Sequence, residues 1–172
     1  MNLDGLNRIL SIGEAMLELS QIDLAGQTAR VAVAGDTLNT AIYLARLLPA
    51  CHVGFATRLG ADGLSRAMVA EIAAQGVATE AIGQDETRLP GVYAIDLDAQ
   101  GERHFHYWRA QSAARTLFAG GAPALDRLDG YRLVYLSGIT LAILGPAARV
   151  DLLDKLAACR ESGLRVAFDS NY

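Results

Sequence analysis

The sequence predicts an α/β fold: a mostly parallel sheet flanked by helices, with a second, small β-sheet beside it. Three observations lead to this prediction. Short apolar runs alternate with longer helical patterns, as in proteins built from β-α-β units. Hydrophobic residues make up 52% of the 172 residues and charged residues 20%, so a sizeable core can form. Strand segments near residues 17–33 and 91–109 interrupt the alternation, and we expect them to form a lid over the ligand-binding edge of the sheet.

Strand and helix patterns follow one another through the first third of the chain. Residues 8–13 form a short apolar run that ends at a glycine, and residues 17–20 and 29–33 are further strand segments. Residues 36–48 have apolar side chains at helical spacing and are followed by a proline, which predicts a helix. The next strand is expected over residues 52–57, where larger and smaller side chains alternate.

The middle of the chain contains a second helix and a hairpin. The helix is expected to begin near Asp62, because aspartate is a good N-cap and an apolar repeat at helical spacing follows it. Gly76 lies where a left-handed residue commonly ends a helix. Residues 91–109 are expected to form a β-hairpin, because the turn-forming residues Asp98–Gly101 separate two strand segments.

The last third of the chain repeats the strand, helix, strand pattern after a loop that contains residues 120–123. A buried strand is expected over residues 132–137 and a long helix over residues 146–162, with proline at its start and glycine after its end. Residues 164–169 form the final strand. A further helix or a site residue is expected at the carboxyl end of such a strand, so the sheet is predicted to be incomplete.

Charge and composition exclude several classes of protein. The net charge is −4, Lys155 is the only lysine and no run of basic residues occurs, so we expect no nucleic-acid binding. No apolar run approaches the roughly 20 residues that span a bilayer, and no signal-peptide pattern occurs at the N-terminus. Cys51 and Cys159 stand alone, as is usual in a reducing compartment. These features predict a cytoplasmic protein with no membrane partner.

The segment Ala34–Asn39 opens the first helix and is a candidate ligand site. Gly35 allows a close approach between the backbone and a ligand, and a helix N-terminus favours a negative or hydroxyl-rich group. The amide of Asn39 can donate and accept hydrogen bonds to hydroxyls. The alternative is that Asp36 or Thr37 merely caps the helix and that the glycine makes a turn.

The hairpin carries three further candidates for binding a small anionic ligand. Arg109 can hold a carboxylate through two hydrogen bonds, while neighbouring aromatic rings such as Tyr107 can form a wall for a sugar-like chain. The alternative is an exposed strand arginine whose aliphatic stem lies over Trp108. Tyr93 is either a partner for ligand hydroxyls or a core tyrosine with a solvated hydroxyl.

Other polar residues are weaker candidates. His104 and His106 share one strand face, but no third ligand accompanies them, so we predict no metal site. Glu14 and Glu18 follow the first strand and can meet a ligand, although such residues are more often solvated edges. No phosphate-binding glycine motif and no nucleophile triad occurs in the sequence.

Two sets of segments resemble known proteins. Ile9–Ser20, Ala34–Ala41 and Thr57–Gly63 resemble the amino-terminal half of ribokinase-like carbohydrate kinases. A finer set resembles the 2-keto-3-deoxygluconate kinase branch of that family, and it consists of Arg88–Tyr93, Gly101–Arg103, Tyr107–Arg109, Leu136–Leu144 and Phe168–Tyr172.

The resemblance implies a ribokinase-like fold and ATP-dependent phosphorylation of 2-keto-3-deoxygluconate at its terminal hydroxyl, with Mg²⁺ accompanying the ATP. It implies that Gly35 and Asn39 contact substrate hydroxyls. It also implies that Tyr93, Tyr107 and Arg109 contribute from the lid, with Arg109 facing the carboxylate of the keto acid. Because lid sheets in this family can pair between subunits, a homo-oligomer is expected.

The resemblance further implies that residues 1–172 are the amino-terminal part of one ribokinase-like domain. The carboxyl-terminal half of the fold, which in relatives supplies the catalytic aspartate and most of the nucleotide pocket, is missing. We therefore expect no catalytic residue in this chain, with the base beyond Tyr172, and we expect the isolated chain to be inactive. The alternatives are a non-catalytic sugar-acid-binding or oligomerisation module, or a related sugar kinase such as fructokinase.

Overall fold

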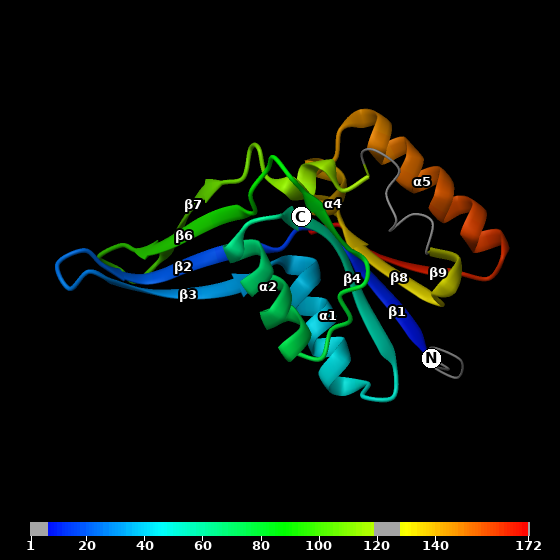
Figure 1. Cartoon of the computed structure of the whole chain (residues 1–172), viewed down its shortest axis with the longest axis horizontal. Helices are drawn as coiled ribbons and strands as arrows, with labels where there is room; N and C mark the ends of the chain where they lie inside the picture. The colour runs from blue at the N-terminus through cyan, green and yellow to red at the C-terminus, as the bar shows by residue number, and fades with distance from the viewer. Residues whose placement is uncertain (1–6, 119–127, 172) are drawn as a thin grey trace.

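The computed structural model describes residues 7–118 and 128–171, which form two sheets with helices packed on the larger one (Figure 1). The larger sheet has five parallel strands in the order β5-β4-β1-β8-β9. Its strands are β1 (Arg8–Ile12), β4 (His52–Gly60), β5 (Ile82–Asp85), β8 (Leu133–Ser137) and β9 (Arg165–Asp169). The first strand of the chain therefore lies at the centre of this sheet, between β4 and β8.

The smaller sheet has four strands in the order β3-β2-β6-β7 and extends away from the larger sheet (Figure 1). Its strands are β2 (Met16–Asp23), β3 (Thr28–Ala34), β6 (Gly91–Leu97) and β7 (Arg103–Trp108). β2 and β3 form one antiparallel hairpin and β6 and β7 another, and the parallel pairing of β2 with β6 joins them. The prediction of a small separate sheet from these two segments is confirmed.

Helices cover both faces of the larger sheet. α1 and α2 lie together on one face and α5 lies on the other (Figure 1). The helices are α1 (Asp36–Leu47), α2 (Gly63–Ala74), α4 (Gly138–Ile143) and α5 (Pro146–Glu161), with the short 3-10 helices η1 (Ala113–Thr116) and η2 (Leu128–Gly130). Together with the parallel strands they form the predicted α/β architecture.

The ends of α2 and α5 lie where local chemistry predicts them. The Asp62 side chain accepts hydrogen bonds from two backbone N–H groups in the first turn of α2, so it is the N-cap of that helix. Gly76 follows the helix with a φ of 82°. α5 begins with Pro146, and Gly163 beyond its end has a φ of 97°. A residue without Cβ adopts these left-handed conformations without strain, and each glycine thus ends its helix.

Alternating side chains of β1 enter two separate cores, one on each face of the sheet. Ile9 packs in one core with Phe55 and Met68, beneath α1 and α2. Leu10 packs in the other with Leu152 of α5. All five side chains are at most 1% exposed. Burying each stabilises the fold by roughly 1.5–3 kcal/mol relative to exposure, which fixes the position of the central strand.

The structure differs from the sequence-based expectations at β4, β5 and α4. β4 continues to Gly60, beyond the expected end at Thr57, because its last residues pair with β5, a strand that the sequence pattern did not predict. α4 was not predicted either, and it begins directly after β8 with a capping box formed by Ser137 and Thr140. The predicted loop over residues 120–123 lies outside the described residues.

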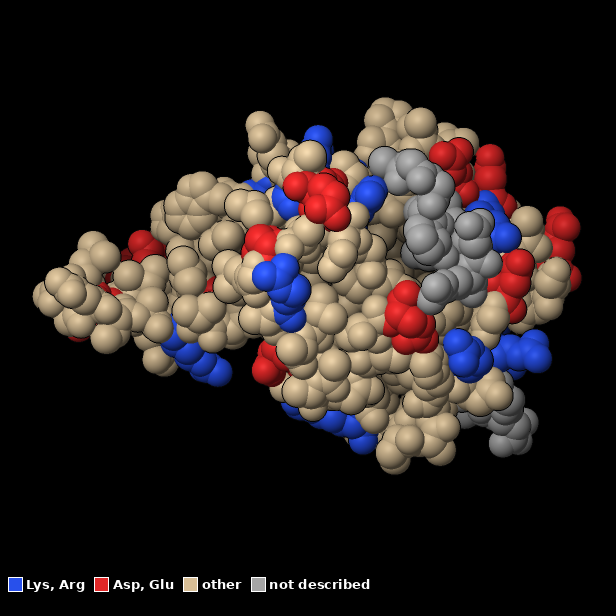
Figure 2. Space-filling view, in the orientation of Figure 1, with Lys and Arg blue, Asp and Glu red and all other residues tan. Residues whose placement is uncertain are grey.

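Charged groups are dispersed on the molecular surface. On the face in Figure 2, Lys and Arg side chains are interspersed with Asp and Glu rather than gathered in one patch. This face therefore lacks the continuous basic surface that a nucleic-acid backbone requires. Within residues 7–118 and 128–171, no helix combines the length and the hydropathy needed to cross a bilayer.

Candidate functional site

The carboxyl ends of the parallel strands meet the small sheet at a tight junction. Gly13–Ala15 alone separate β1 from β2, and Gly35 alone separates β3 from α1. β8 ends at Ser137, which caps α4. Ligands of open α/β sheets bind outside the carboxyl ends of the strands, so a ligand-binding site is expected at this junction.

Glu14 is buried at this junction, with its side chain 1% exposed. The Ser112 hydroxyl donates a hydrogen bond to Glu14 Oε1 over 2.5 Å, and Arg109 Nη2 forms an ion pair with Glu14 Oε2, also at 2.5 Å. The expectation of a solvated edge is therefore wrong for Glu14, because the segment after β7 folds back over the end of β1. Burial of a carboxylate is costly, and a cation at contact distance offsets that cost.

Two glycines provide the space that Glu14 occupies. A Cβ added at Gly35 would lie 2.2 Å from the Glu14 carbonyl oxygen. A Cβ added at Gly91 would lie 2.8 Å from Glu14 Oε1 and 3.2 Å from Arg109 Cβ. Gly35 has an extended φ of 168°, so its role here is to leave space rather than to permit an unusual conformation. This packing role is separate from the predicted ligand contact.

Arg109 directly follows β7, and its side chain is 22% exposed. The guanidinium carbon lies 5.8 Å from the centroid of the Tyr107 ring, while one of its nitrogens contacts Glu14. The alternative of an exposed strand arginine is therefore wrong. Within the described part of the chain, Arg109 Nε and Nη1 form no hydrogen bond, so these two donors are available to a ligand.

Tyr93 and Tyr107 lie opposite each other across β6 and β7, on the sheet face that also carries Glu18. Their ring centroids are 5.7 Å apart, and the Tyr93 hydroxyl donates a hydrogen bond to Glu18 Oε2 over 2.5 Å. Burial and this hydrogen bond raise the pKa of Tyr93, which keeps the phenol protonated. Tyr93 is buried, whereas Tyr107 is 53% exposed, so the second ring is the more accessible one.

Asp36 connects the start of α1 to the ends of β8 and β9. Its Oδ2 accepts hydrogen bonds from the Ser137 hydroxyl and, over 3.1 Å, from Asn171 Nδ2. The N-cap of α1 is Gly35, and no side chain caps this helix, so the expectation that Asp36 or Thr37 does so is wrong. The carboxylate instead joins three elements at the carboxyl edge of the sheet.

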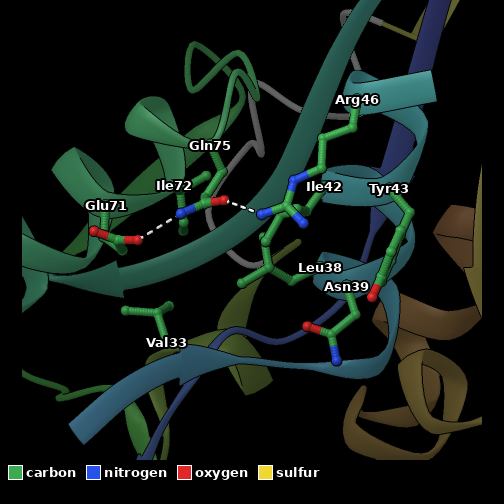
Figure 3. A pocket seen from close by; sticks show the side chains of 9 residues that line it. All are labelled: Val33, Leu38, Asn39, Ile42, Tyr43, Arg46, Glu71, Ile72 and Gln75. Atoms are coloured by element: carbon green, nitrogen blue, oxygen red, sulfur yellow. Dashed lines mark hydrogen bonds between the residues drawn. The ribbon is translucent and has the colours of Figure 1, made fainter. Parts of the chain in front are cut away.

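Asn39 lies apart from the hairpin residues. It is exposed on α1 and lines a pocket of about 240 Å³ between α1 and α2 (Figure 3). Across that pocket Arg46 donates a hydrogen bond to Gln75 Oε1, and Gln75 Nε2 donates one to Glu71 Oε1 over 2.8 Å. The structure thus does not place Asn39 in the same pocket as Tyr107 and Arg109.

A larger pocket of about 570 Å³ lies beside Tyr107 and Arg109. Ser112 and Arg88 also line it, and Arg88 Nη1 reaches the Gln111 carbonyl oxygen at 3.5 Å. Two guanidinium groups beside aromatic and apolar walls suit a small ligand with a negative end. Sequence reasoning missed Ser112 as part of this site, because no local pattern marks it, and it named Glu14 only as a weak candidate.

The two hairpin histidines each lie close to an aspartate. His104 Nε2 lies 3.2 Å from Asp98 Oδ2, and His106 Nε2 lies 3.3 Å from Asp96 Oδ2. Such exposed pairs contribute little to stability. Among the residues with described positions, no three His, Cys, Asp or Glu side chains form a group that could hold a metal ion.

The sequence matches a known protein family and is similar to individual enzymes over nearly its whole length. Residues 6–172 match the family described as pfkB family carbohydrate kinase. The 2-dehydro-3-deoxygluconokinase of Dickeya dadantii (strain 3937) is 45% identical over 168 residues, which are 95% of this chain and 53% of that protein. The enzyme of the same name from Escherichia coli (strain K12) is 41% identical over 169 residues, 96% of this chain and 54% of that protein.

A solved structure is also similar to this chain over nearly its whole length. The crystal structure of 2-dehydro-3-deoxygluconokinase from Thermotoga maritima has a TM-score of 0.83 and 30% sequence identity to this chain. The match covers 96% of this chain and 51% of that one. The chain thus spans about half the length of the relatives that it matches.

Proposed function

The chain belongs to the pfkB family of carbohydrate kinases, and on that premise we propose that it forms the substrate-binding part of a 2-keto-3-deoxygluconate kinase. Such an enzyme transfers the γ-phosphoryl group of ATP to the terminal hydroxyl of this keto acid, which is also called 2-dehydro-3-deoxygluconate. The relatives at 41% and 45% identity carry that name, which supports the choice of substrate.

The position of Arg109 is the observation that carries the proposal. The substrate has a carboxylate at one end and hydroxyls along its length, whereas a neutral hexose has no charged end. A guanidinium binds a carboxylate through charge-assisted hydrogen bonds from its N–H groups. Arg109 offers Nε and Nη1 beside a pocket of about 570 Å³, and in our proposal the carboxylate end lies there.

The other candidates take supporting roles in this proposal. The exposed ring of Tyr107 forms a wall for the carbon chain. The Tyr93 hydroxyl donates a hydrogen bond to Glu18, and its oxygen remains able to accept a hydrogen bond from the substrate. Gly35 and Asn39 are proposed to contact hydroxyls, which requires a substrate that reaches from the hairpin past the start of α1.

We propose ATP and Mg²⁺ only because the chain belongs to the pfkB family of carbohydrate kinases. The described residues offer no group of three potential metal ligands, so we assign no Mg²⁺ site to them and derive no step through the ion. No described residue is assigned as catalytic base. In the proposal, the base and most of the nucleotide site lie outside residues 1–172, and this chain on its own binds the keto acid without phosphorylating it.

The proposal also covers location and assembly. We place the enzyme in the cytoplasm, where a reducing medium keeps Cys51 and Cys159 as thiols.

We further propose that the small sheet pairs with the same sheet of a second copy. β3 and β7 are its outer strands, and Val31 and Trp108 on them, which the register places on one sheet face, are 59% and 62% exposed. Exposed apolar sheet surface is typical of an interface, and analytical ultracentrifugation measures the assembly.

Kinetics with two sugars test the proposal. The complete polypeptide, as its gene encodes it, is assayed with 2-keto-3-deoxygluconate and with fructose, as wild type, Arg109→Ala and Arg103→Ala. Arg103 is the matched control, an exposed arginine on β7 whose register places it on the same sheet face as Tyr107. We expect Arg109→Ala to raise the KM for the keto acid roughly 10- to 100-fold, because a charge-assisted pair is lost.

The control variant is expected to keep the wild-type KM for both sugars. Two outcomes contradict the proposal. One is a wild-type enzyme that prefers fructose, which points to a related sugar kinase. The other is an equal loss for both sugars in Arg109→Ala, which removes the assigned carboxylate contact.

A further inference from the structure

Glu14 is a buried charged group to which the proposed function gives no role. We propose that Glu14 is a positioning residue, which holds the guanidinium of Arg109 in the orientation that receives a substrate carboxylate. This inference rests on the proposed function, because it requires a substrate with a carboxylate.

Burial prevents Glu14 from acting on a ligand directly. Its side chain is 1% exposed, against 22% for that of Arg109, which lies between it and the pocket. Ser112 and Arg109 contact one carboxylate oxygen each. Any effect of Glu14 on a ligand must therefore pass through these two side chains, and Arg109 is the one with donors left for a ligand.

The carboxylate itself is held firmly. Gly91 has no Cβ, and this leaves the space that the Glu14 carboxylate occupies. The Ser112 hydroxyl fixes Oε1, so that Oε2 meets Arg109 Nη2. The residue that orients Arg109 is thus itself oriented by two neighbours, as a precise binding site requires.

The ion pair with Glu14 occupies one of the three nitrogens of the Arg109 guanidinium. Nη2 is directed to Glu14 and the carbon lies 5.8 Å from the Tyr107 ring centroid, so two contacts restrict a side chain that otherwise rotates about several bonds. The donors on Nε and Nη1 are left for the ligand. A carboxylate that orients a ligand-binding side chain from behind is a common device in metal sites, and here it acts on an arginine.

A purely electrostatic role of Glu14 predicts the opposite effect on binding. The negative charge of Glu14 repels a substrate carboxylate, so its removal would strengthen binding of the acid if charge alone mattered. If orientation matters more, removal weakens binding of the acid and leaves a neutral sugar unaffected. The sign of the change in preference for the acid over the neutral sugar therefore separates the two.

Glu14→Gln is the variant that tests this, since it keeps the shape and removes the charge. We measure the ratio of kcat/KM for 2-keto-3-deoxygluconate to that for fructose in the complete polypeptide. Glu14→Gln is expected to lower this ratio about tenfold, the effect of one weakened charge-assisted hydrogen bond. In an Arg109→Ala background the same change is expected to have no further effect. Arg103→Ala is the matched control, because it removes an exposed charge from the same small sheet, and it is expected to leave the ratio unchanged.

The outcomes separate this inference from the proposed function. If Arg109→Ala leaves the ratio unchanged, the proposed function loses its carboxylate contact. If Arg109→Ala lowers the ratio while Glu14→Gln leaves it unchanged or raises it, the positioning role alone is overturned. An equal loss in Arg103→Ala and Glu14→Gln also overturns it, since any change of charge in the small sheet would then have the same effect.

A measurement on the wild type covers the case in which Glu14→Gln does not fold. Nitrogen-15 NMR of arginine side chains reports how freely each guanidinium rotates. Arg109 is expected to rotate slowly without substrate, whereas exposed Arg103 rotates freely. Equal and fast rotation of both overturns the inference. Glu14→Asp, which keeps the charge on a shorter side chain, is expected to retain a higher ratio than Glu14→Gln.

Discussion

Replacing Gly35 with alanine tests the close approach between the start of α1 and the end of β1. The added Cβ would lie 2.2 Å from the Glu14 carbonyl oxygen, whereas ordinary van der Waals contact begins at 3.4 Å. Both groups are fixed to the backbone of packed elements, so neither can rotate away. Overpacking of this kind costs about 1–3 kcal/mol, and we therefore expect the melting temperature to fall by roughly 3–10 °C.

Thermal unfolding followed by far-ultraviolet circular dichroism measures this change. Gly130→Ala is the matched control, because a Cβ at Gly130 meets nothing within 4 Å and the residue is exposed in η2. The control is expected to change the unfolding free energy by less than about 0.5 kcal/mol. If Gly35→Ala melts together with wild type and the control, the reasoning that Glu14 and the start of α1 are rigidly packed is refuted.

Three further predictions concern a core residue, a helix cap and the effect of pH. Phe55→Ala removes a ring that is 0% exposed and is expected to lower the unfolding free energy in urea by roughly 3–5 kcal/mol. Leu24→Ala, at a side chain 87% exposed, is expected to change it by less than about 0.5 kcal/mol. Asp62→Ala leaves two N–H groups of α2 without an acceptor and is expected to cost about 1 kcal/mol in the same titration. Hydrogen bonds, first from the backbone of Thr87, lower the pKa of Asp85 from 3.8 to about 2. The stability that Asp85 contributes is therefore present above its unfolded pKa and is lost as pH falls towards 2, so Asp85→Asn is expected to flatten the pH dependence of unfolding there.

Each of these predictions has an outcome that contradicts it. Equal losses from the variants at Phe55 and Leu24 mean that the assigned core does not determine stability. An unchanged midpoint for Asp62→Ala means that water replaces the cap. A pH profile that keeps its slope between about pH 4 and pH 2 without Asp85 means that other carboxylates dominate acid unfolding.

Elements whose ends depend on their own residues were predictable from the sequence. Asp62 and Gly76 bound α2 because a cap and a left-handed glycine act on the nearest turn only. β5 and α4 were not predictable in this way. β5 has four residues and no hydrophobic alternation, and it is a strand because Thr57–Gly60 of β4 pairs with it. α4 has six residues, too few to show a helical period.

In the candidate site, too, one feature follows from the local sequence and another depends on contacts with distant residues. The pairing of Tyr93 with Tyr107 follows from the hairpin register, which the turn residues between the strands indicate. The burial of Glu14 depends instead on the return of the chain at Arg109 and Ser112, far away in sequence. A glutamate after a strand has the same local pattern whether it is solvated or covered. The substrate contacts of the candidate residues stay predictions until a ligand is bound.

The central place of β1 in the larger sheet affects how the chain folds during synthesis. One edge of β1 can pair with β4 early, but the other pairs Ile9 with Leu133 of β8, which the ribosome makes much later. Contacts between residues so distant in sequence form slowly, and an open strand edge is a template for aggregation in the meantime. The yield of folded protein in cells therefore depends on how well the nascent chain is protected before β8 emerges, and not only on the stability of the finished fold.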